Sequence, residues 1–128
     1  MQPMSTVAGI FAVIAGLFHV AAFAMESLLF HRASVRRIMT GRTEDVPAVR
    51  IWAFNQGFYN LFLAVGAFVG VYAWATDHET VGDALVLFSC GAMALAGIVL
   101  VVSDHRLWRG ALGQFIPPAI AVLATLLA

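Results

Sequence analysis

Charge is scarce in this sequence, and lysine is absent. Only 11% of the 128 residues are charged and 62% are hydrophobic, whereas about a quarter of the residues of a soluble domain are charged. So few charges cannot cover the surface of a globular domain in water, which excludes a soluble fold. The seven arginines balance seven acids, so the chain has neither a broad basic surface for nucleic acid nor an acidic tail. We expect the lipid bilayer as its partner and no nucleic acid.

Cysteine and cofactor motifs are also scarce. The single cysteine, Cys90, excludes an intramolecular disulfide. No glycine-rich phosphate loop and no nucleophile elbow occur, so we expect no cofactor. His19 and Glu26, seven residues apart, do not have the spacing of a metal-ligand pair, so we expect no metal either.

Long apolar runs dominate what is present. A membrane-crossing helix needs about 20 apolar residues, and the segments between the apolar runs are too short for a second domain. The first run is longer than the apolar region of a secretory signal and no basic residue precedes it, so we expect it to be retained. The sequence therefore predicts one all-α domain over residues 1–128, a four-helix transmembrane bundle with spans at about 5–30, 51–76, 84–103 and 107–127.

The placement of arginine predicts the orientation of the bundle. Five arginines lie between the first and second spans, and Arg106 and Arg109 lie at the start of the fourth. These two connections are on the same side of a four-span bundle, and the positive-inside rule assigns that side to the cytoplasm. We therefore expect a multi-pass protein of the bacterial cytoplasmic (inner) membrane with both termini extracytoplasmic.

The arginine-rich connection, residues 31–50, is the only long loop that the sequence predicts. Its arginines are suited to contact the anionic headgroups of lipids. We therefore favour electrostatic anchoring at the membrane surface. A binding site for a phosphate-bearing ligand is the alternative, and no glycine-rich phosphate loop supports it.

Polar residues inside the spans are the informative exceptions, because a polar group in hydrocarbon is costly and usually faces the bundle interior or a wet cavity. In the first span the positions 9, 12, 16, 19, 23 and 26 alternate steps of three and four, which predicts a seam packed on a neighbouring helix. Counting from the span ends places Glu26 level with Asn55 and Gln56, and His19 level with Asn60. We predict a cluster in the cytoplasmic half of the bundle formed by His19, Glu26, Asn55, Gln56, Tyr59, Asn60 and Gln114.

The cluster has a purely structural interpretation and a functional one. Interhelical hydrogen bonds, worth about 0.6 kcal/mol each, could simply hold the helices together. Seven polar side chains with both an acid and an imidazole exceed that need, and an imidazole can exchange a proton near neutral pH. We predict a catalytic, proton-handling pair of Glu26 and His19, with ligand-binding donors in Asn55, Gln56, Tyr59, Asn60 and Gln114.

A set of residues spread over nearly the whole chain carries a family resemblance: His19, Glu26, the block Asn55-Gln56-Gly57-Phe58-Tyr59-Asn60, Leu63-Ala64, Ala96-Gly97, Gln114 and Pro117. With these residues the chain resembles the small bacterial four-span membrane proteins of the domain of unknown function 1304 family. The block that begins at Asn55 is the most specific part. The resemblance implies an integral membrane protein and implies no reaction.

The function predicted from the residues is binding of a small lipophilic molecule in an intramembrane polar pocket. Acid/base, isomerase-like chemistry there would make the protein an enzyme, a point that the sequence leaves open. One alternative is a proton-coupled small transporter, expected to be a homodimer because four short helices enclose little space. The other is a structural or partner-binding membrane subunit.

Overall fold

The computed structural model describes residues 3–128 and is 88% helical. Four helices in it are long and apolar enough to cross a membrane, and the described residues contain no strand. The predicted all-α fold is therefore confirmed, and the chain is a multi-pass membrane protein. The elements in chain order are α1 (Pro3–Phe23), a π-helical turn η1 (Ala24–Leu28), α2 (Ala33–Thr40), α3 (Pro47–Ala75), α4 (Glu79–Ser103), a 3-10 turn η2 (His105–Leu107) and α5 (Trp108–Leu127).

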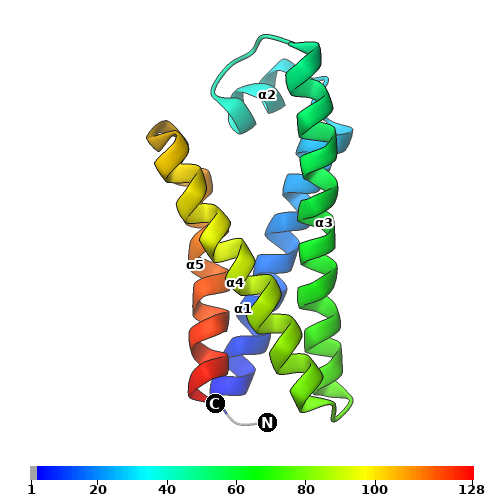
Figure 1. The fold of residues 1–128 in the computed structure, drawn as a ribbon, viewed down its shortest axis with the longest axis vertical. Coiled ribbons are helices and arrows are strands. Elements are labelled where there is room, and N and C mark those ends of the chain that lie inside the picture. Colours follow the sequence, from blue (N-terminus) through cyan, green and yellow to red (C-terminus); the bar gives the residue numbers. More distant parts are fainter. Residues whose placement is uncertain (1–2) are drawn as a thin grey trace.

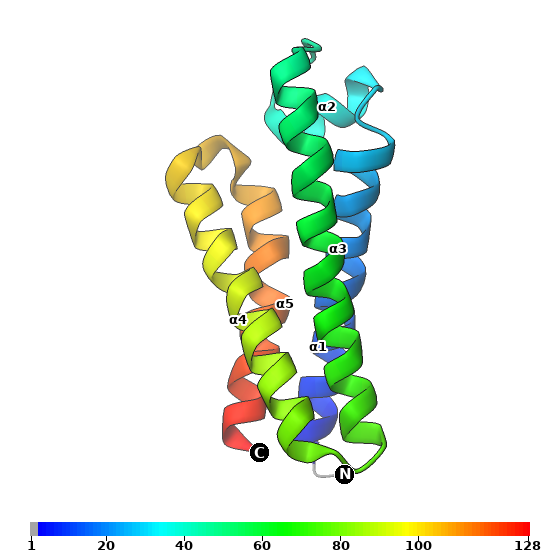
Figure 2. The same cartoon turned by 45° about the vertical axis from the view of Figure 1, so that its right-hand side comes forward.

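The four long helices form a ring in which α1 packs on α3 and α5, and α4 packs on the same two helices. The chain ends and the turn between α3 and α4 lie at one end of the bundle, and α2 lies across the other (Figure 1). Figure 2 shows the α4–α5 connection towards the α2 end as well. Both arginine-bearing connections therefore share one end, while Asp77, Glu79 and Asp83 occupy the other.

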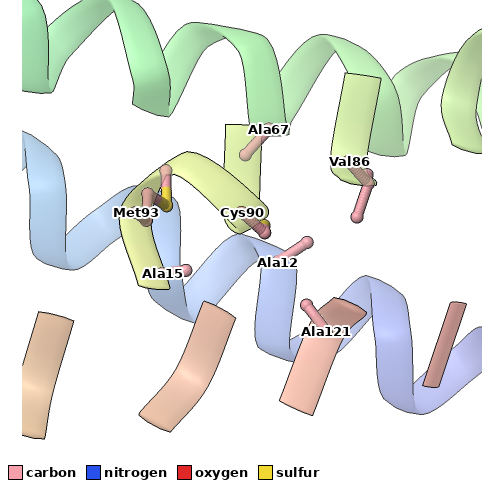
Figure 3. Close-up of a cluster of buried hydrophobic side chains, with 7 residues drawn as sticks. All are labelled: Ala12, Ala15, Ala67, Val86, Cys90, Met93 and Ala121. Atoms are coloured by element: carbon pink, nitrogen blue, oxygen red, sulfur yellow. The ribbon is translucent and has the colours of Figure 1, made fainter. Parts of the chain in front are cut away.

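Small side chains fill the centre of the bundle and let the helices approach closely, as membrane helices require. On α1 the buried positions are Ala8, Ala12, Ala15, Gly16, His19 and Ala22. Two of them, Ala12 and Ala15, belong to an apolar core cluster to which all four long helices contribute (Figure 3). The cluster consists of Ala12, Ala15, Ala67, Val86, Cys90, Met93 and Ala121.

The buried seam of α1 differs from the predicted one. The sequence predicted positions 9, 12, 16, 19, 23 and 26, whereas the core-facing seam is 8, 12, 15, 19 and 22. The reason is that α1 has two neighbours, so its buried face is wider than one seam. Gly16 is buried too, but against Phe68 of α3 and not in the core cluster.

Close contact between α3 and α4 depends on Gly70. A Cβ atom at this position would lie 2.8 Å from Val86 Cγ2 and 3.1 Å from the Val86 backbone nitrogen. By contrast, a Cβ at Gly91 of α4 would meet nothing within 4 Å. The two glycines are therefore a matched pair for testing the packing.

We expect Gly70→Ala to lower the free energy of unfolding by about 1–3 kcal/mol, because overpacking forces α3 and α4 apart. Gly91→Ala should be neutral or stabilising by up to about 1 kcal/mol, because alanine favours a helix over glycine. Thermal unfolding in detergent measures the change in stability of both variants. Equal effects of the two substitutions would contradict the close α3–α4 contact.

Candidate functional site

The ends of α1 and α3 determine which polar residues meet. Helix α3 begins at Pro47, a favoured first helical residue, and so extends four residues beyond the predicted start at Ile51. Its 29 residues span about 43 Å, more than the roughly 30 Å hydrocarbon core of a bilayer. At the end of α1, the Leu29 N–H donates to the Ala24 carbonyl at 2.8 Å, which is the spacing of a π turn.

The π turn η1 brings Glu26 to α3. Asn60 Nδ2 donates to Glu26 Oε1 at 2.6 Å, and Asn60 is buried. The Ser27 hydroxyl donates to the Phe54 carbonyl at 2.7 Å over Gly57, where a Cβ atom would overlap it. Glu26 is therefore at the level of Asn60, about one helical turn from the predicted level of Asn55 and Gln56.

His19 is buried in the bundle with one ring nitrogen unused. Its side chain is only 1% exposed, and Nδ1 donates to the Ala15 carbonyl at 2.8 Å. Among the described residues Nε2 has no hydrogen-bond partner. Because a carbonyl can only accept, the proton belongs on Nδ1, and the neutral ring presents a free acceptor at Nε2. Buried acceptors without a partner are uncommon, which singles out His19 as a chemically available group.

A cavity of about 590 Å³ lies at the α2 end of the bundle. Glu26, Asn60 and Gln114 are on its wall, so three of the seven predicted residues share one space. His19 is not on the wall, but Ala22, on the same face of α1, is. The remaining lining is largely apolar with charged residues among it: Phe18, Ala22, Met25, Arg37, Ile38, Met39, Thr40, Gly41, Leu100, Asp104, Arg106, Leu107, Arg109 and Gly110.

The structure does not bring Asn55, Gln56 and Tyr59 into this cavity. All three are exposed, Tyr59 to 60%. Positions 56, 59, 63, 66 and 70 form one seam of α3, whose lower part packs on α4: Gly66 faces Ser89, and Gly70 faces Val86. Towards the α2 end α4 leads away from α3 (Figure 1), so α4 does not cover the upper part of the seam, where Gln56 and Tyr59 are exposed.

Arg36 is a residue of the site that the sequence did not single out. It is 8% exposed, and its guanidinium donates to the carbonyls of Thr43, Phe30 and His31 at 2.9, 3.0 and 2.9 Å. These bonds fasten α2 to the end of η1, and α2 supplies part of the cavity wall. A weak signal was available in the apolar positions 35, 38 and 39 of α2, which have the spacing of one helical face.

Among the charged residues that line the cavity, some form an ion pair and others do not. Arg106 donates from Nε and Nη2 to the two carboxylate oxygens of Asp104, at 3.0 and 2.9 Å. These side-chain hydrogen bonds, with one from the Arg106 backbone, lower the pKa of Asp104 to about 2. Asp104 is therefore ionised at any physiological pH and neutralises Arg106. Arg37 and Arg109 have no ion pair in residues 3–128.

A second cavity of about 750 Å³ lies at the opposite end of the bundle. It contains none of the predicted site residues, and its Trp74 Nε1 donates to Asp83 Oδ1 at 2.8 Å. Within the described part of the chain, no three His, Cys, Asp or Glu side chains are grouped so that they could hold a metal ion. The polar groups that line the α2-end cavity are two carboxyl groups, two amides, one hydroxyl and three guanidinium groups.

The family described as protein of unknown function (DUF1304) matches residues 13–126. No curated protein and no solved structure matches the chain.

We expect Asn60→Ala to lower the free energy of unfolding by about 1–3 kcal/mol, because the half-buried Glu26 carboxyl loses its donor. Gln56→Ala, one turn away and exposed, should change it by less than about 0.5 kcal/mol. Thermal unfolding in detergent compares the two variants. Equal stability of Asn60→Ala and Gln56→Ala would contradict a stabilising Glu26–Asn60 bond.

Proposed function

The chain belongs to the family of proteins of unknown function DUF1304, and because that description names no activity, we propose a function from the site itself. The protein binds a small lipophilic molecule in the α2-end cavity. In this proposal Glu26 and His19 handle protons, while Asn60 and Gln114 orient the bound molecule by hydrogen bonds.

The observation that carries this proposal is the composition of the cavity wall. Ligand pockets are typically about 300–1,000 Å³, mostly apolar, with a few convergent polar groups, and this cavity of about 590 Å³ has that character. Glu26 is already bonded to Asn60, so the carboxyl is held in place before a ligand arrives. Gln114 comes from α5, and its amide can donate or accept.

The exposed seam of α3 supports a route from the bilayer. Gln56 and Tyr59 lie on the side of α3 from which α4 leads away, and Asn55 is the neighbouring exposed amide. Exposed polar side chains in a membrane span are costly and usually functional. We place these three residues at the entrance, where they would meet a lipophilic molecule before it reaches Glu26.

The proposed chemistry uses the two groups that can exchange a proton. The Glu26 carboxyl is on the cavity wall, and His19, seven residues earlier in the chain, has an acceptor nitrogen inside the bundle. Carboxyl and imidazole groups are suited to general acid/base catalysis, so in this proposal they move a proton between two positions of a bound molecule. No covalent intermediate is required.

The cavity can be tested with a neutral probe, a long-chain alcohol that carries a photoreactive diazirine. We expect labelling of peptides that contain Met25, Met39 and Leu107, which line the cavity. Gly110 also lines it, and a Cβ there meets nothing within 4 Å, so Gly110→Trp should fill the cavity without a clash. This substitution should reduce labelling about tenfold, equivalent to about 1.4 kcal/mol.

Gly91→Trp is the matched control, because its Cβ is also unobstructed but Gly91 is not on the cavity wall. Labelling spread evenly over the lipid-facing surface and unchanged by Gly110→Trp would refute the pocket. Labelling at both this cavity and the one at the opposite end would favour the transporter.

For the orientation we propose that the α2 end faces the cytoplasm in a bacterial inner membrane, because every arginine lies towards that end. The native Cys90 is buried, so an introduced cysteine can be read with little background. An impermeant maleimide added outside spheroplasts should label Glu79→Cys at once and Arg42→Cys only after permeabilisation. The reverse pattern would overturn the proposed orientation.

A further inference from the structure

We propose that the molecule bound in the α2-end cavity is an anionic amphiphile whose acidic head, a carboxylate or a phosphate, is held between Arg37 and Arg109. This inference rests on the proposed function and adds the chemical class of the ligand. It assigns to two arginines a ligand-binding role, where the sequence favoured contact with lipid headgroups.

Arg37 and its neighbour Arg36 differ in the hydrogen bonds of their guanidinium groups. Arg36 is buried, and its guanidinium donates hydrogen bonds to three backbone carbonyls. The guanidinium of Arg37 has no hydrogen bond or ion pair in the described part of the chain, and Arg37 lines the cavity. The two adjacent arginines therefore have different roles: Arg36 holds α2 in position, and Arg37 is available to a ligand.

Arg106 and Arg109, the two other arginines that line the cavity, also differ from each other. Arg106 is satisfied by both oxygens of Asp104, whereas Arg109 has no carboxylate partner in residues 3–128. The Arg109 guanidinium carbon lies 5.3 Å from the centroid of the Trp108 ring, a contact that orients a cation. Of the three arginines that line the cavity, Arg106 is neutralised by Asp104, whereas Arg37 and Arg109 have no counter-ion in residues 3–128.

Arg37 of α2 and Arg109 of α5 place two positive charges on the wall of one cavity. Like charges on one cavity wall repel each other, and an anion bound between them removes that repulsion. The planar guanidinium fork matches the geometry of a carboxylate or phosphate and binds it with two parallel hydrogen bonds.

The Glu26 carboxyl already accepts a hydrogen bond from Asn60 and, when ionised, repels an anion, so the charged head of the ligand belongs beside the arginines and away from Glu26. Apolar side chains from three elements, Ile38, Leu100 and Leu107, surround the rest of the space. From Arg109 to Gln114 along α5 is about 7.5 Å, so a second polar group of the ligand at that distance from the head would reach the amide of Gln114.

The experiment compares three photoreactive probes that have one diazirine-bearing chain and differ only in the head: a carboxylate, an alcohol and a trimethylammonium. The full-length protein is studied in phosphatidylcholine nanodiscs. We expect the carboxylate probe to label the cavity about tenfold more efficiently than the alcohol, and the cationic probe less than either. Arg37→Gln and Arg109→Gln should each remove most of that tenfold advantage, measured as the ratio of carboxylate to alcohol labelling within the same variant.

Arg42→Gln is the matched control, because Arg42 is an exposed arginine of the same connection that does not line the cavity. If Arg42→Gln reduces labelling by the carboxylate probe as much as the other two variants, the arginines act only as a general surface charge, and the proposal fails. Equal labelling by carboxylate and alcohol would also overturn it.

Competition identifies the source of the anionic head. Dodecyl phosphate should displace the carboxylate probe, and inorganic phosphate at the same concentration should not. Equal displacement by the two would mean that a water-soluble phosphate compound is recognised, which contradicts an amphiphile.

Failure of this inference and failure of the proposed function are distinguishable. Alcohol labelling that responds to Gly110→Trp, without any advantage for the carboxylate, would preserve the pocket and refute the acidic head. Absence of cavity labelling by all three probes would refute both.

Discussion

The hydrogen bond between Glu26 and Asn60 is the interaction on which the site depends. Hydrocarbon supplies no water to a carboxyl group, so an acid inside a span needs a partner from the protein. Asn60 supplies it from α3, and the π turn η1 directs Glu26 towards that amide. The same turn places Ser27 against the Phe54 carbonyl. One local change in helical pitch therefore joins α1 to α3 and sets a polar group on the cavity wall.

Much of the fold could be predicted because its cause is local. Apolar runs long enough to cross a bilayer specify four helices whatever their neighbours are, and the structure has them. The polar residues required more. His19, Glu26 and Asn60 face inward, but the level at which they meet depends on the π turn and on the early start of α3 at Pro47. A count at 1.5 Å per residue from assumed ends cannot include either feature.

The arginine-rich connection shows a different limit. Arg36 and Arg37 are adjacent and identical in type, and no local rule separates them. Only the folded position of α2 directs one guanidinium to the carbonyls of Phe30, His31 and Thr43 and leaves the other beside the cavity. Composition thus predicts the side of the membrane on which arginines gather, whereas the role of each arginine is decided by tertiary structure.

The cavity itself follows from a gradient of side-chain size along one seam of α3. At the end near the chain termini the seam consists of Gly70 and Gly66, which let α4 approach until Val86 and Ser89 touch the α3 backbone region. Further along, the seam continues with Leu63, Tyr59 and Gln56. Glycine lets a neighbouring helix approach more closely than larger side chains do, so the close α3–α4 contact is confined to the glycine part of the seam, and α4 inclines away from α3 beyond it. The α4–α5 pair then diverges from α1 and α3 only at the α2 end, where Glu26, Asn60 and Gln114 line the space that results.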